Sequence, residues 1–156
     1  MNKNDKKIII NAFQEKVVSV LKQNGFTGRF PHFRKIKENQ IDLLSIQFDK
    51  WGGGYRICLS KCPAQTIKDL LKRDVEPQKA TAWHFGDRYT SDWFRYDYAS
   101  EDKIQQVAEN LALQSVEFLN VAKHYWEGRL VQRQSKWLIL KTKLGDLISL
   151  KKHTSH

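Results

Sequence analysis

Two stretches of alternating apolar and polar residues flank three consecutive glycines, and this pattern constrains the fold more than any other feature of the chain. The apolar members are Leu44, Ile46 and Phe48 before the glycines and Tyr55, Ile57 and Leu59 after them. A period of two predicts strands with one buried face. We expect an antiparallel hairpin here, in which the glycines provide positive φ angles and Trp51 and Tyr55 pack beside the turn. A phosphate-binding loop is excluded because such a loop leads into a helix, whereas here a strand follows.

Helices are predicted at both ends of this β-rich region. Apolar residues recur every three or four positions from Asp5 to Asn24, and again from Ser100 to about Tyr125, after which Gly128 ends the pattern. The segments RFPHFRKI, TAWHF and DWFRYDY are predicted as further strands, and AQTIKDLLKRD as a short helix. The expected fold class is α+β: an antiparallel β-sheet (meander) with N-terminal and long C-terminal helices packed on one face.

The rest of the chain is expected to belong to the same domain. Residues 130–150 carry apolar residues in seven-residue steps with Lys and Arg between them, which favours another helix that packs in the core or binds another chain; the alternative is a strand at the short run WLILK. With 156 residues, the chain suits a single domain over 1–150 and a disordered tail over 151–156. No secretory signal and no membrane span is evident, and two cysteines make no disulfide framework, so we expect a cytoplasmic protein. We expect neither cofactor nor metal.

The net charge of +10 is unevenly distributed along the chain. Residues 1–40 and 121–156 carry +6 each, residues 41–80 carry +2, and residues 81–120, the most aromatic part, carry −4. A groove for single-stranded nucleic acid would combine aromatic and basic residues. The distribution therefore favours a protein partner over nucleic acid, although basic ends that converge on one face would support nucleic acid.

The segment WHFGDRYTSDW holds most of the candidate functional residues. Residue types suited to acid–base chemistry occur there, and the same types also make an ordinary salt-bridged turn. No nucleophile motif, second carboxylate pair or metal-ligand cluster accompanies them, and Cys58 and Cys62 are expected to be buried. The candidate functional surface comprises Arg34, Trp51, Tyr55, Trp83, His84, Asp87, Arg88, Asp92 and Trp93.

Several short motifs, taken in order, resemble a known family. These are NGF at 24–26, FRK, SIQFDKWGGGYRICL, WHFGDR and DWF, and together they resemble the bacterial domain of unknown function 4304 over roughly residues 8–125. The resemblance implies a compact α+β domain and no established activity. Small bacterial domains of this kind sometimes neutralise toxins as immunity partners, which is an analogy at the level of the fold.

Three functional hypotheses follow. The first is a non-enzymatic binding domain for a protein partner, which predicts an exposed aromatic patch near Trp83–Trp93 or along the last helix. The second is nucleic-acid binding through basic termini. The third is a small enzyme in which His84 acts with Asp87 or Asp92, which requires these side chains to meet in a pocket.

Overall fold

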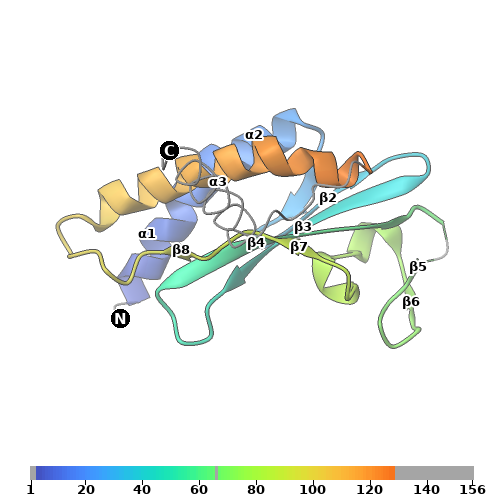
Figure 1. Cartoon of the computed structure of the whole chain (residues 1–156), viewed down its shortest axis with the longest axis horizontal. Coiled ribbons are helices and arrows are strands. Elements are labelled where there is room, and N and C mark those ends of the chain that lie inside the picture. Colours follow the sequence, from blue (N-terminus) through green and yellow to red (C-terminus); the bar gives the residue numbers. More distant parts are fainter. Residues whose placement is uncertain (1–2, 66, 129–156) are drawn as a thin grey trace, which may run out of the picture.

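The fold is an antiparallel sheet with helices on one face, seen in a computed structural model that describes residues 3–65 and 67–128 (Figure 1). The strand order is β1-β2-β3-β4-β7, and β8 also pairs with β4. The strands of this sheet are β1 (Thr27–Arg29), β2 (His32–Ile36), β3 (Gln40–Phe48), β4 (Gly54–Pro63), β7 (Tyr89–Thr90) and β8 (Phe94–Arg95). The predicted α+β class and the meander, which runs through β1 to β4, are confirmed.

The β3–β4 hairpin is the longest strand pair of the sheet. Its register pairs Phe48 with Tyr55 and continues without interruption to Gln40 with Pro63. The apolar residues predicted from the alternation therefore share one face. The other face carries Ile41, Leu43, Ser45 and Gln47 of β3 and Arg56, Cys58, Ser60 and Cys62 of β4.

Helices cover the first face of the sheet. The N-terminal helix comprises α1 (Lys3–Phe13), a π-helical turn (Gln14–Val18) and α2 (Ser19–Gln23), and it ends at Gly25, whose φ is +84°. The second helix is α3 (Ile104–Trp126), followed by Gly128 with φ of +73°. Both helices lie along the same side of the sheet (Figure 1). The main core between them is formed by apolar residues of α1, α3, β3 and β4.

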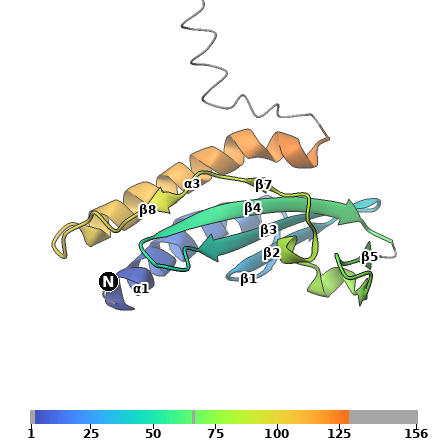
Figure 2. The same ribbon diagram turned by 60° about the horizontal axis from the view of Figure 1, so that its bottom comes forward.

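The second face is buried along most of β3 and β4, and of its residues on these two strands only Gln47 and Arg56, next to the β3–β4 turn, are partly exposed. The chain after β4 forms the small hairpin of β5 (Ile67–Lys68) and β6 (Asp74–Val75), then two 3₁₀ turns, Pro77–Lys79 and Ala82–His84. Ala80 and Ala82 are fully buried there against Ile41, Leu43 and Cys58. In Figure 2 this segment lies at the end of the sheet that is farthest from the β3–β4 turn.

Four local predictions differ from the structure. The segment 64–74 forms the β5–β6 hairpin rather than a helix, and TAWHF contains a 3₁₀ turn rather than a strand. Only Phe94 and Arg95 of DWFRYDY are in a strand, because β8 pairs over two positions with the start of β4. The last helix starts later than the predicted Ser100, at Ile104, after a turn in which Lys103 N–H donates to the Ser100 carbonyl. The predicted helix over 130–150 and the tail lie outside the described residues.

Candidate functional site

Polar and aromatic side chains gather on the second face of the sheet, from the contact with the 67–85 segment to the partly exposed end near the β3–β4 turn. The register of three strands brings them together, because His32 of β2 pairs with Ser45 of β3 and Ser45 pairs with Cys58 of β4. Side chains at paired positions of neighbouring strands lie on the same face. We call the resulting set the arginine–tryptophan surface; it comprises His32, Arg34, Ser45, Gln47, Arg56, Cys58, Trp83, Arg88 and Trp93.

Arg56 occupies the end of this surface nearest the β3–β4 turn. Its Nε donates a hydrogen bond of 2.7 Å to Gln47 Oε1, the residue paired with it across the strands. Its guanidinium carbon also lies 4.9 Å from the centre of the Trp93 ring, within the range of a cation–π contact. Trp93 precedes β8 and remains 38% exposed. Arg56 is thus held in place on two sides beside an accessible indole.

Arg88 and Trp83 form a second cation–π pair on the same surface. The Arg88 guanidinium lies 5.4 Å from the Trp83 ring centre, and Trp83 meets the His32 ring edge-to-face at 6.2 Å. Arg88 and Arg56 both lie near the Cys58 thiol, since the positive charges of both act on its pKa. The two arginines therefore approach the same part of β4 from different segments.

His32 and Arg34 complete the surface on β2. The Ser45 hydroxyl accepts a hydrogen bond of 3.2 Å from Ala82 N–H and shares another of 2.8 Å with His32 Nδ1. Arg34 Nε donates to the Ala80 carbonyl at 3.0 Å. Burial lowers the pKa of His32 from 6.5, and the charges of Arg34 and His84 lower it further. His32 is therefore mainly neutral at pH 7, and the positive charge of the surface comes from its arginines.

The cysteines under this surface are buried thiols. Cys58 is completely buried and Cys62 is 5% exposed, which confirms the sequence-based expectation. Burial raises the pKa of Cys58, and the charges of Arg56 and Arg88 only oppose this effect. Burial, together with the charge of Asp42, raises the pKa of Cys62 to about 11. Both thiols are protonated near neutral pH and are poor nucleophiles.

Comparison with known proteins assigns the chain to a family. The family model for a domain of unknown function, DUF4304, matches residues 17–120. The chain belongs to the DUF4304 family. No curated protein and no solved structure matches the chain. Every residue of the arginine–tryptophan surface lies inside the part of the chain that matches DUF4304.

His84, the central residue of the enzyme hypothesis, has a local structural role in this DUF4304 chain. Its Nδ1 accepts a hydrogen bond of 2.9 Å from the Thr81 backbone N–H, and Thr81 Oγ1 lies 3.3 Å away. These contacts form a capping box around the 3₁₀ turn. The lone pair of Nδ1 is thereby used within the turn.

The two aspartates of that hypothesis are exposed. The Asp87 carbonyl accepts a hydrogen bond of 3.0 Å from Ser60 Oγ, and the charge of its carboxylate adds to burial in raising the pKa of Tyr125 on α3. The Asp92 carbonyl accepts a hydrogen bond of 2.7 Å from Ser91 Oγ. Within residues 3–65 and 67–128, no group of three His, Cys, Asp or Glu side chains is arranged to hold a metal ion.

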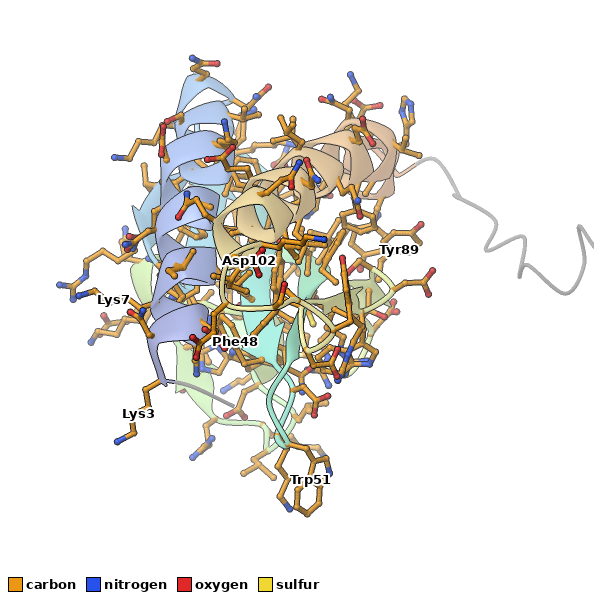
Figure 3. The ribbon with its side chains drawn as sticks, turned by 90° about the vertical axis from the view of Figure 1, so that its left-hand side faces the viewer. Lys3, Lys7, Phe48, Trp51, Tyr89 and Asp102 are labelled. Carbon is orange, nitrogen blue, oxygen red and sulfur yellow. The ribbon has the colours of Figure 1, made fainter. Side chains whose placement is uncertain are left out.

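Trp51 lies apart from the arginine–tryptophan surface, at the tip of the β3–β4 hairpin. It is 86% exposed, and Figure 3 shows its side chain pointing away from the rest of the molecule. The expectation that Trp51 packs beside the turn is therefore wrong. The Asp49 carboxylate accepts a hydrogen bond of 2.9 Å from the Trp51 backbone N–H, which restrains the backbone of the tip although the indole side chain is exposed.

Tyr55 lies in the main core with only 1% of its surface exposed, so it does not belong to the arginine–tryptophan surface. The structure thus brings together Arg34, Trp83, Arg88 and Trp93 of the predicted set. Five members of the site were not predicted from the sequence: His32, Ser45, Gln47, Arg56 and Cys58. The signal for Arg56 was present, because the alternation of β4 already placed it on the same face as Cys58.

Among the described residues, no helix is both long and apolar enough to span a bilayer. The outer side of α3 exposes Leu113 and Val121, at 52% and 63%. The predicted last helix, which could have supplied a partner surface, lies outside the described residues.

Proposed function

We propose that this DUF4304 chain is a cytoplasmic bacterial binding domain without enzymatic activity, and that it binds a protein partner through the arginine–tryptophan surface. The observation that carries this proposal is the Arg56–Trp93 pair at the partly exposed end of the second face. Arg56 is fixed by Gln47 at 2.7 Å, and Trp93 remains 38% exposed beside it.

Tryptophan and arginine are the residues most enriched among those that dominate protein–protein binding energies. Their side chains normally lose conformational entropy when a partner binds. Here Arg56 is already restrained by Gln47 and Trp93, and Arg88 by Trp83. This preorganisation reduces the entropic cost of association, which supports a binding role for the surface.

The charge distribution favours protein over nucleic acid as the partner. Residues 129–156 contain seven of the 27 Lys and Arg residues and only one of the 17 acidic residues. Residues 1–128 therefore carry a net charge of only +4.

The test is affinity capture of the tagged full chain from its own host, with and without nuclease, at low and moderate salt. We expect a stoichiometric protein that survives nuclease treatment and that is lost with the Trp93→Ser variant. The matched control is Leu113→Ser, which removes an exposed apolar side chain from α3 and should retain the partner. If the captured protein is a toxin, inhibition assays will test an immunity role.

Two outcomes contradict the proposal. Recovery of nucleic acid that disappears with nuclease and with salt would make the charge the functional feature. Equal loss of the partner with both variants would place the contact elsewhere, provided that unfolding measurements show both variants to be folded.

A further inference from the structure

The positive groups of the arginine–tryptophan surface are spread over the sheet rather than gathered around one point. Arg34 pairs with Leu43 and Leu43 with Ser60, which is four residues along β4 from Arg56. Two strand spacings of about 4.8 Å and four residues of about 3.3 Å put the Cα atoms of Arg34 and Arg56 roughly 16 Å apart.

The contacts of the two side chains keep their guanidinium groups separate. Arg34 is held against the Ala80 carbonyl, beside the covered end of the face. Arg56 is held against Gln47 and Trp93, towards the other end. A single small anion such as phosphate therefore cannot contact both groups. The occupant that would use the whole surface must carry several negative groups at separated positions.

The hydrogen bonds of these arginines leave their terminal nitrogens for a ligand. Arg34 and Arg56 each use Nε to hold their position in the fold. The Nη atoms of a guanidinium donate well to carboxylates, often through two parallel hydrogen bonds. Trp83 and Trp93 provide apolar area next to the same cations. This combination fits a polypeptide, because a polypeptide segment can present acidic and apolar side chains at neighbouring positions.

From these observations we propose that the occupant of the arginine–tryptophan surface is an acidic segment of a protein, with at least two carboxylates that bind Arg34 and Arg56 and a further carboxylate that binds Arg88. The inference rests on the proposed function and names the chemistry of the partner. Four residues of an extended chain span about 13 Å, which is comparable to the separation of the two outer arginines.

The test uses a blocked oligoglutamate peptide as the probe and the full chain as the protein. Binding is measured by calorimetry and by tryptophan fluorescence in wild type and in the double variant Arg56→Gln/Arg88→Gln. We expect the double variant to bind the peptide roughly tenfold more weakly, because each charged hydrogen bond at a partly exposed site contributes about three- to fivefold.

The matched control is Lys7→Gln/Lys22→Gln, which changes the net charge by the same amount at exposed positions of α1 and α2, the helices that cover the opposite face of the sheet. We expect this control to bind the peptide within about twofold of wild type under moderate salt, because exposed charges beyond a Debye length are screened. Equal weakening in the two double variants would show non-specific attraction and would overturn the inference. Tighter binding of an oligothymidylate of the same net charge, lost in the arginine variant alone, would also overturn it.

The inference and the proposed function can fail separately. If a host protein is captured in a Trp93-dependent manner while oligoglutamate does not distinguish the two double variants, the partner-binding role stands and the acidic segment is wrong. If the peptide distinguishes the variants and no host protein depends on Trp93, the anion-binding property stands and the proposed function is wrong.

Discussion

The phenolic oxygen of Tyr55 on β4 lies 2.8 Å from the hydroxyl oxygen of Ser115 on α3. Both hydroxyls also lie within hydrogen-bond distance of the Leu111 carbonyl, Ser115 Oγ at 2.8 Å and the Tyr55 oxygen at 3.2 Å. Tyr55 is 1% exposed and Ser115 is completely buried. This hydrogen bond therefore joins the middle of the sheet to the middle of the long helix inside the core.

Replacing Tyr55 by Phe should lower the free energy of unfolding by about 1 kcal/mol, measured by urea denaturation. The ring keeps its packing, and Ser115 keeps its bond to Leu111. The control is Tyr89→Phe, at a half-buried ring that stacks on Phe118 and Tyr125, where we expect a change within about 0.5 kcal/mol. A larger loss in the control than in Tyr55→Phe would contradict this account.

The stabilising effect of the Tyr55 hydroxyl should reverse at high pH. Burial raises the pKa of Tyr55 to about 12 in the folded protein, whereas its ordinary value is 10.0. Below pH 10 both states are protonated, but between these two values only the unfolded state loses its proton, so stability falls as the pH rises. At pH 11 this costs wild type about 1.4 kcal/mol relative to Tyr55→Phe. Urea unfolding curves should therefore show wild type as the more stable protein at pH 9 and Tyr55→Phe as the more stable protein at pH 11.

The elements that the sequence predicted correctly are those with long, regular periodicity. The alternation around Gly52–Gly54 defined β3 and β4, and the three-to-four spacing defined both helices. The segment around Ile67, Leu70 and Leu71 has helical spacing too, yet it forms a hairpin. Asp69 explains this difference, because its carboxylate accepts the backbone N–H groups of Leu71 and Arg73 at 2.8 and 2.9 Å. Such local side-chain bonds compete with helix formation.

The candidate site was predictable only in part, for a different reason. The alternation of β4 puts Arg56 on the same face as Cys58, and this can be read from the local sequence. The contact of Arg56 with Trp93 depends on the return of the chain to β4, where Phe94 pairs with Tyr55. Arg56 and Trp93 are far apart in the sequence, and no local pattern specifies a two-residue strand such as β8.

The turn beside Trp51 should be intolerant of a side chain at Gly53. This residue has a φ of +75°, and a Cβ atom there would lie 2.5 Å from Asp97 Cβ. Gly53→Ala should therefore lower the free energy of unfolding by about 3 kcal/mol, through backbone strain and overpacking together. Gly128 is a matched control because its φ is +73° and, within the described part of the chain, nothing lies within 4 Å of an added Cβ. Gly128→Ala should cost only about 1 kcal/mol, the contribution of strain alone. Equal costs would show that Asp97 moves aside.

Acidification should weaken the fold through His32. The pKa of this histidine is lowered from 6.5 by burial first and then by the charges of Arg34 and His84. The contribution of His32 to stability is therefore complete above pH 6.5 and is lost as the pH falls through its lower folded pKa, because the unfolded state binds the proton first. An NMR titration of the His32 ring should give a midpoint below 6.5 in wild type. Arg34→Gln should raise this midpoint while leaving it below 6.5, because burial remains, and Lys22→Gln on the exposed side of α2 should leave it unchanged. A midpoint at or above 6.5 in wild type, or no response to Arg34→Gln, would show that the histidine is solvated and that the arginine–tryptophan surface carries an additional positive charge near neutral pH.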